Sequence, residues 1–109
     1  VLSPGVIVRP GAVVRESIIS TDCVIESGAV VERAVLDKGV HVEQNARIGW
    51  GIADQVIKIA LVGKHSVVPA GFVVEPEAEV GTDVVASDYD ESVVRAGQVI
   101  QTRRLANEI

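Results

Sequence analysis

Residues 2–18 read LSPGVIVRPGAVVRESI, residues 19–35 read ISTDCVIESGAVVERAV, and residues 36–52 read LDKGVHVEQNARIGWGI. These segments are three successive repeat units of equal length, and each unit divides into steps of six, six and five residues. A unit this short cannot bury its apolar side chains by itself. The repeat therefore predicts a stack of similar units that share one continuous core.

The apolar residues recur at fixed places within the steps. The first residue of every step is aliphatic: Leu2, Val8, Val14, Ile19, Ile25, Val31, Leu36, Val42 and Ile48. The residue four positions later is also apolar: Val6, Ala12, Ile18, Cys23, Ala29, Val35, Val40, Ala46 and Ile52. Where a step has six residues, this position and the start of the next step lie two apart and share one face of a strand. We expect an inward apolar pair at each short strand, with Leu2, Ile19 and Leu36 stacked.

Residues that tolerate positive φ mark two corners of each unit. They form two columns whose members are spaced by one repeat unit: Gly5, Asp22 and Gly39, and then Gly11, Gly28 and Asn45. The third corner, at Ser17 and Ala34, lacks this signal, and its step is one residue short. We expect a three-sided coil whose third corner is tighter and of a different type.

The repeat resumes after a break and then stops. Residues 62–85 (VGKHSVVPAGFVVEPEAEVGTDVV) follow the same rule, whereas 49–55 are expected to form a loop and 56–61 a strand that re-enters the coil. We place the coil at residues 1–85 and an acidic loop with a short irregular C-terminal tail at 86–109. Because the chain lacks an initial Met and already begins within the repeat, we expect it to be a fragment of a longer protein.

The composition supports an all-β fold. The chain is 48% hydrophobic but only 3% aromatic, so its core consists mainly of small and β-branched residues, which favour strands. A helix would need apolar spacings of three and four, and an antiparallel sandwich would need longer strands. The net charge of −5 argues against nucleic-acid and anionic-membrane partners, and one cysteine excludes an internal disulfide. We expect a cytoplasmic protein.

The repeats resemble the hexapeptide family, whose members form left-handed parallel β-helices. The segments VLSPGV, SGAVVERAVLDKGV, ARIG, ALVGKHSVVPAG and VVEPEAEVG resemble the C-terminal domain of bacterial glucose-1-phosphate adenylyltransferases. This resemblance implies that the chain is the assembly and regulatory end of a nucleotidyltransferase and is not itself catalytic. It implies as partners an N-terminal catalytic domain, sister subunits of a homotetramer and a sugar-phosphate effector.

The same resemblance implies Mg²⁺ in the parent enzyme, but no cofactor, catalytic residue or metal site in this chain. One departure concerns the segment after ARIG, which is longer in the family than Trp50 to Val56 here. The shorter segment leaves two interpretations open: its effector contacts are absent, or the chain comes from a less regulated relative. Related guanylyl- and uridylyltransferases, which carry similar β-helices, remain open as well.

Two groups of residues are candidates for contacts. Ile7 with Val24, and Val13 with Val30, lie one repeat unit apart and predict two outward apolar strips that end at His41 and Arg47; such strips commonly mark interfaces. Arg33, Arg103 and Arg104 are candidate effector ligands, because a guanidinium suits phosphate.

Two other functions remain open. Many hexapeptide proteins are acyltransferases that take an acyl-CoA substrate and use a histidine as general base. His41 and His65 are predicted to be exposed, but no carboxylate at an obvious spacing orients either ring. The second alternative is a non-catalytic oligomerisation scaffold.

Overall fold

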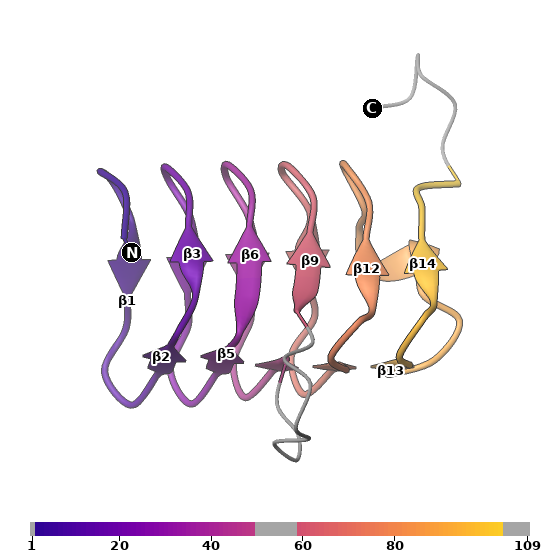
Figure 1. The fold of residues 1–109 in the computed structure, drawn as a ribbon, viewed down its shortest axis with the longest axis horizontal. Coiled ribbons are helices and arrows are strands. Elements are labelled where there is room, and N and C mark those ends of the chain that lie inside the picture. Colours follow the sequence, from indigo (N-terminus) through magenta and orange to yellow (C-terminus); the bar gives the residue numbers. More distant parts are fainter. Residues whose placement is uncertain (1, 50–58, 104–109) are drawn as a thin grey trace.

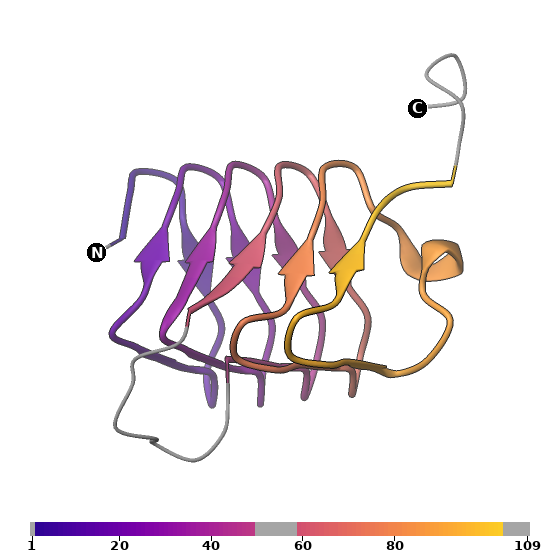
Figure 2. The ribbon, with the colours of Figure 1, turned by 45° about the vertical axis from the view of Figure 1, so that its right-hand side comes forward.

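The computed structural model describes residues 2–49 and 59–103. Within these ranges nearly all regular structure is β-strand, and every strand pairing is parallel. The strands form three sheets that run the length of the molecule, and successive strands along the chain move from one sheet to the next (Figures 1 and 2). This arrangement is the three-sided coil that the repeat predicts.

Sheet 1 has the order β1-β4-β7-β10, with bounds Ile7–Val8, Val24–Ile25, His41–Val42 and Val67–Val68. Sheet 2 has the order β2-β5-β8-β11-β13, with bounds Val13–Arg15, Val30–Glu32, Arg47–Ile48, Val73–Val74 and Val93–Val94. Sheet 3 has the order β3-β6-β9-β12-β14, with bounds Ile18–Ile19, Ala34–Leu36, Ala60–Val62, Glu79–Val80 and Val99–Ile100.

The coil is left-handed. In Figure 1 the chain rises along the near strands β3, β6 and β9, turns over the top to the far side, and advances from left to right with each coil. The hexapeptide resemblance predicts this handedness, which is the reverse of the usual β-crossover. The fold is therefore a left-handed parallel β-helix.

The stacking register follows the repeat. Leu2 bridges Ile19, Ile19 pairs with Leu36, and Leu36 pairs with Val62, so these four residues form one inward column. The buried core is made almost entirely of small and β-branched side chains from such columns. Its fully enclosed larger members include Ile25, Val31, Val42, Ile48, Val68, Val74 and Val80. The prediction of Leu2, Ile19 and Leu36 as a stack is confirmed.

The two corners predicted from Gly, Asp and Asn have positive φ. All six predicted residues, from Gly5 to Asn45, lie in the left-handed region. The third corner has the same property, contrary to expectation, because Glu16 and Arg33 both have φ 49°. Ser17 stabilises this corner, since its Oγ donates to the Arg15 carbonyl at 2.8 Å and accepts from the Ala34 N–H at 3.1 Å.

The short third step changes which residues face inward. Ile18 and Ile19 are consecutive in one strand, so they point to opposite faces, and only Ile19 enters the core. The same holds for Val35 beside Leu36. The inward pair predicted for six-residue steps therefore does not form at the five-residue step: Ile18 is 53% exposed, and Val35 is half-buried.

The coil continues beyond the boundary predicted at residue 85. β13 pairs with β11 and β14 pairs with β12, so the β-helix reaches Ile100. The place of a fifth strand in sheet 1 is taken by a 3₁₀ turn, Ala86–Asp88, and the following Tyr89 donates from its hydroxyl to the Val67 carbonyl at 2.8 Å. This inserted turn breaks the sequence spacing, which explains the early boundary. The predicted loop at 49–55, beyond Gly49, lies outside the described residues.

The two ends of the coil differ. Val94 of the last coil is 1% exposed, whereas Leu2 and Val8 of the first coil are 55% and 38% exposed although both occupy inward positions. Their exposure shows that the interior opens at the first coil.

Candidate functional site

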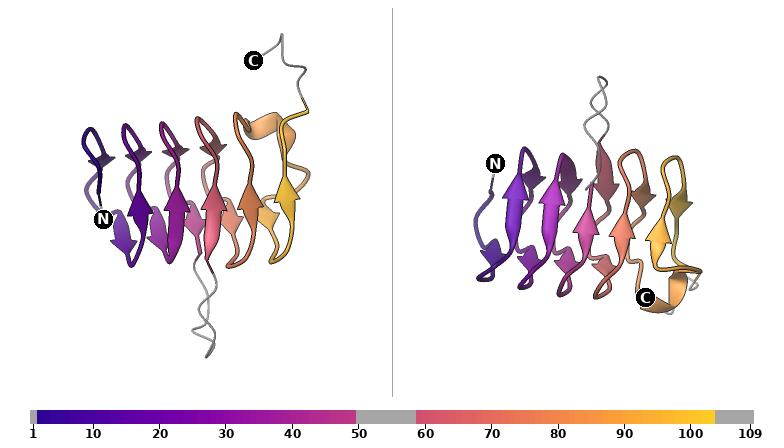
Figure 3. Two further views of the ribbon diagram at one scale, coloured as in Figure 1. Left: turned by 45° about the horizontal axis from the view of Figure 1, so that its top comes forward. Right: turned by 90° about the horizontal axis from the view of Figure 1, so that it is seen from below.

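The outer surface of sheet 3 carries an apolar face. One outward column runs through consecutive strands in register, from Ile18 to Val35, Leu61, Glu79 and Val99. Ile59 lies beside it, just before β9. We call Ile18, Val35, Ile59, Leu61 and Val99 the apolar face. The left panel of Figure 3 shows the five strands of this sheet side by side.

This face is the most exposed apolar surface along the sides of the described coil. Four of its members are 42–53% exposed: Ile18 53%, Leu61 42%, Ile59 47% and Val99 52%. Val35 is half-buried. Apolar side chains that gather in this way on one sheet, rather than scattering, commonly mark a contact surface. The sequence analysis missed this face because it counted Ile18 and Val35 only as members of an apolar column and did not derive which way they face.

Charged residues lie along one side of the apolar face and, at Glu79, within its central column. Arg33 Nε donates to Glu16 Oε2 at 2.9 Å, and this hydrogen bond raises the pKa of the guanidinium. Two coils further on, Glu77 and Glu79 are exposed on the same sheet. The face is therefore apolar in its middle, with a cation-bearing pair towards its first coils and carboxylates towards its last coils.

A shallow hollow lies where the Glu16–Arg33 pair meets the apolar face. Its volume is about 200 Å³, and it is lined by Glu16, Ile18, Arg33, Ala34, Val35 and Ile59. One charged pair beside apolar walls could hold a small anion against Arg33 or an apolar side chain from a partner. Its size suits a group no larger than part of a sugar phosphate.

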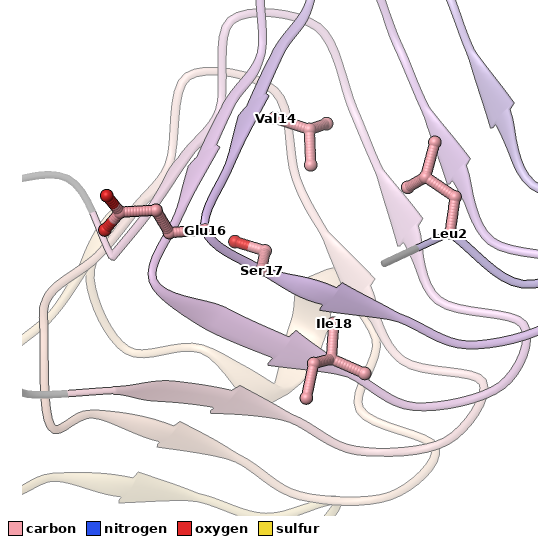
Figure 4. Close-up of a pocket in the computed structure, with 5 residues that line it drawn as sticks. All are labelled: Leu2, Val14, Glu16, Ser17 and Ile18. Carbon is pink, nitrogen blue, oxygen red and sulfur yellow. The ribbon is translucent and has the colours of Figure 1, made fainter.

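A second hollow, of about 400 Å³, opens at the first coil (Figure 4). Leu2 and Val14 line it from the inner side of the coil, while Glu16 and Ile18 lie on the outer side of the same corner. Because its inner walls are apolar core positions, this hollow is not a typical site for a polar metabolite.

The structure forms the two predicted apolar strips, and each continues past its polar interruption. Ile7 pairs with Val24 and Val24 with His41, after which Val67 follows on sheet 1. On sheet 2, Val13 pairs with Val30, and Arg47 separates Val30 from Val73. Ile7 is 42% exposed, whereas Val13, Val24 and Val30 are less exposed and are half-buried. Their role as an interface stays a prediction.

The three candidate effector arginines do not gather at one site. Arg33 lies at the third corner with Glu16, whereas Arg103 lies beyond the last coil and donates from Nη2 to Asp90 Oδ1 at 2.5 Å. That hydrogen bond raises the pKa of Arg103. Arg104 lies outside the described residues. Each described arginine already has a carboxylate partner, so an anion would have to compete with it.

Asp88 is a buried carboxylate that the sequence analysis assigned only to an acidic loop. It is 2% exposed, and its carboxylate accepts from the backbone N–H groups of Val85 at 3.0 Å and Arg103 at 2.9 Å. These bonds fix the 3₁₀ turn to the start of the tail. Asp88 is therefore a structural residue, and the sequence signal for it was weak because three other acidic residues surround it.

The two histidines do have carboxylate neighbours, so the expectation that none orients them was wrong. His41 Nε2 lies 2.8 Å from Glu26 Oε2, and Arg9 Nε lies 3.5 Å from the other oxygen of Glu26. His65 Nδ1 lies 3.8 Å from Asp83 Oδ1. Glu26 precedes His41 by 15 residues, two fewer than one repeat unit. This spacing places the two residues diagonally on neighbouring strands, and it could have revealed their contact.

The described residues contain neither a metal-binding cluster nor a membrane-spanning helix. Across 2–49 and 59–103, no group of three or more His, Cys, Asp or Glu side chains is placed to hold a metal ion. In the same ranges, no helix is long and apolar enough to cross a membrane. The lone Cys23 is buried, and burial raises the pKa of its thiol, which leaves it unreactive.

The parallel coil, the inward aliphatic columns and the left-handed corners define a hexapeptide-repeat protein. Residues 1–58 match the family model described as GlmU-like, C-terminal hexapeptide, and the chain belongs to that family. It is also 42% identical over 77 residues to a glucose-1-phosphate adenylyltransferase from Thermomicrobium roseum. That similarity covers 62% of this chain but 18% of the relative. No solved structure matches the chain.

Proposed function

We propose that this chain is the β-helix portion of a sugar-1-phosphate nucleotidyltransferase and that it serves assembly and regulation. The similarity to a glucose-1-phosphate adenylyltransferase carries this proposal. The parent reaction is then ATP plus glucose 1-phosphate to ADP-glucose and pyrophosphate, as a step of cytoplasmic α-glucan synthesis.

The surface of the chain supports an assembly role. The open first coil exposes Leu2 and Val8, and the apolar face exposes four further large side chains. We assign the open end to the catalytic domain of the parent and the sides of the coil to sister subunits. Mg²⁺ would serve phosphoryl-type transfer in the catalytic domain of the parent.

Regulation is assigned to the hollow beside Arg33. A guanidinium at the edge of an apolar wall can bind a phosphate group while the wall contacts the sugar ring. Glu16 already occupies the Arg33 guanidinium, so a phosphate that binds there would replace the Arg33–Glu16 ion pair with an Arg33–phosphate ion pair. Arg103 remains a second candidate, although Asp90 competes for it in the same way.

The test uses the full-length protein that contains this chain. We expect it to release pyrophosphate from ATP and glucose 1-phosphate, with stimulation by a sugar phosphate that Arg33→Ala abolishes. Arg47→Ala, on sheet 2, is the matched control and should retain stimulation. Absence of pyrophosphate release with ATP, GTP and UTP would contradict the nucleotidyltransferase assignment. Release that Arg33→Ala leaves fully stimulated would contradict only the regulatory site.

One observation favours a second function. The 2.8 Å contact between His41 and Glu26 is the geometry by which a carboxylate orients a general base, as an acyltransferase requires. Acetyl-CoA turnover by this chain, lost in His41→Ala, would favour that function. In the nucleotidyltransferase assignment the pair is a surface contact, and no turnover occurs. A pure scaffold would show neither activity, with or without the preceding sequence.

A further inference from the structure

The charges beside the apolar face are arranged so that a second copy of the chain can place opposite charges against them. β9 is the central strand of sheet 3, with β6 and β3 on one side and β12 and β14 on the other. Arg33 precedes β6, one strand before the centre, whereas Glu77 and Glu79 lie at β12, one strand after it. The cation and the carboxylates are therefore equally distant from the central strand, in opposite directions.

We propose that two copies of this chain pack through the apolar face of sheet 3, with their helix axes antiparallel and the two-fold axis along β9. This proposal rests on the assembly role given above and specifies its partner and geometry. Rotation about an axis along β9 reverses the order of the coils but preserves position along the strand. Leu61 then meets Leu61 of the other copy, and Ile18 meets Val99.

The charges become complementary in this arrangement. The column through Arg33 continues to Ile59 and Glu77, as the pairing of Ala34 with Ala60 and of Leu61 with Glu79 requires. Arg33 of one copy therefore faces Glu77 of the other, and the two-fold axis produces this contact twice. Glu79 faces Val35 and lies two residues further along the chain than Glu77. Arg33 would then lie between Glu16 of its own copy and a carboxylate of the second.

The alternative two-fold axis along the coil is disfavoured. It preserves the order of the coils, so Glu79 of one copy would face Glu79 of the other in the middle of an apolar surface. Like charges that face each other across an interface cost several kcal/mol. The position of Glu79 therefore selects the antiparallel arrangement over the parallel one.

The size of the face sets the strength of the contact. Five strands at a spacing of about 4.8 Å give a face roughly 20 Å long. Such a face buries on the order of 400 Å² per copy, about half that of a standard specific interface, which corresponds to a weak or transient contact. We expect a weak dimer of the isolated chain, with a dissociation constant on the order of 100 μM.

Sedimentation equilibrium of the 109-residue chain from about 10 μM to 1 mM tests this proposal, over the range in which a weak dimer dissociates. Leu61→Asp should weaken dimerisation about tenfold or more, because it places two carboxylates on the axis. Ala70→Asp is the control, because Ala70 is exposed at the corner between β10 of sheet 1 and β11 of sheet 2, away from sheet 3. It should leave the dimer intact, and circular dichroism verifies that both variants fold.

The decisive arm mixes two charge variants. The first variant carries Arg33→Glu, and the second carries both Glu77→Arg and Glu79→Arg. By itself, each variant places like charges at both contacts, so each should dimerise at least about tenfold more weakly. An equimolar mixture restores opposite charges at both contacts, so the mixed dimer should form with nearly the wild-type constant. Folding defects within one chain cannot produce this rescue.

A monomeric wild-type chain at the highest concentration would overturn the proposal, and so would a mixture that fails to recover. Equal weakening by Ala70→Asp and Leu61→Asp would also overturn it. Association through the open first coil would respond to none of the sheet 3 substitutions. All these outcomes are independent of pyrophosphate release, so failure here leaves the nucleotidyltransferase assignment standing.

Discussion

Arg33 donates from Nε to Glu16 Oε2 at 2.9 Å, and the two residues lie one coil apart at the third corner of the β-helix. Both have φ 49°, so the backbone stacks two left-handed residues and brings their side chains together. The pair is thus a product of the coil geometry, and it holds Arg33 beside the hollow at the edge of sheet 3.

The first prediction concerns competition at this pair. Glu16→Gln removes the negative charge that an anion must displace, so the affinity of the chain for a sugar phosphate should rise several-fold. Arg33→Ala should abolish binding, and Glu43→Gln, which is distant from the hollow, should change nothing. Isothermal titration calorimetry at low salt measures all three. An affinity that falls in Glu16→Gln would contradict the site.

The second prediction compares two glycines of similar backbone conformation. Gly49 has φ 70° and Gly71 has φ 73°. A Cβ at Gly49 would overlap the Glu32 carbonyl oxygen, whereas a Cβ at Gly71 meets nothing within 4 Å. Gly71→Ala should cost about 1–2 kcal/mol from backbone strain alone, and Gly49→Ala should cost distinctly more.

Urea unfolding of both variants measures this difference. The position of the Glu32 carbonyl explains it, because neighbouring coils cannot separate without loss of the hydrogen bonds between strands. Equal costs at Gly49 and Gly71 would show that the coils can move apart at the third corner.

The third prediction concerns Ser66, which is fully buried. Its Oγ donates to the Gly81 carbonyl at 2.5 Å and accepts from the Val84 N–H at 2.9 Å. Ser66→Ala leaves both backbone groups without this partner and should lower the free energy of unfolding by about 1–3 kcal/mol. Ser92→Ala, at an exposed position, is the control. A loss below about 0.5 kcal/mol would mean that water replaces the hydroxyl.

The fourth prediction concerns pH. Burial of Tyr89, with a smaller contribution from the Asp88 charge, raises its pKa above the ordinary value of 10.0. The folded state therefore keeps its proton where the unfolded state loses it. The associated stability is fully present below pH 10 and is lost as pH rises through the pKa of the folded state.

Urea unfolding at pH 8 and above pH 10 tests this effect. The wild-type chain should lose stability over that interval, and Tyr89→Phe should lose less of it. At pH 8, Tyr89→Phe should be less stable by about 1 kcal/mol, because it lacks the hydrogen bond to Val67. Identical alkaline losses in both proteins would show that Tyr89 ionises freely in the fold.

The repeat made most of the fold predictable. The aliphatic columns through Ile19, Ile25 and Val31 enter the core. The Gly, Asp and Asn residues at the two predicted corners adopt the positive φ that these residue types tolerate. Glu16 and Arg33 gave no such signal, because Glu and Arg do not favour positive φ. Their conformation is imposed by the coils above and below.

The apolar face was hidden for a related reason. Ile18 fits the apolar column by counting from the start of its step, but the five-residue step reverses its direction. The last coil was missed because the 3₁₀ turn at Ala86–Asp88 lengthens it, so that Val94 pairs with Val74 at a wider sequence separation than the repeat unit provides. Arg33 was identified from its resemblance to a family segment, whereas its competitor Glu16 required the structure.

The central claim, that this β-helix assembles a larger enzyme, is tested most directly by the mass of the full-length protein in solution. Multi-angle light scattering should show an oligomer for the intact protein and a smaller species after deletion of residues 2–103. An unchanged oligomer after the deletion would contradict the claim.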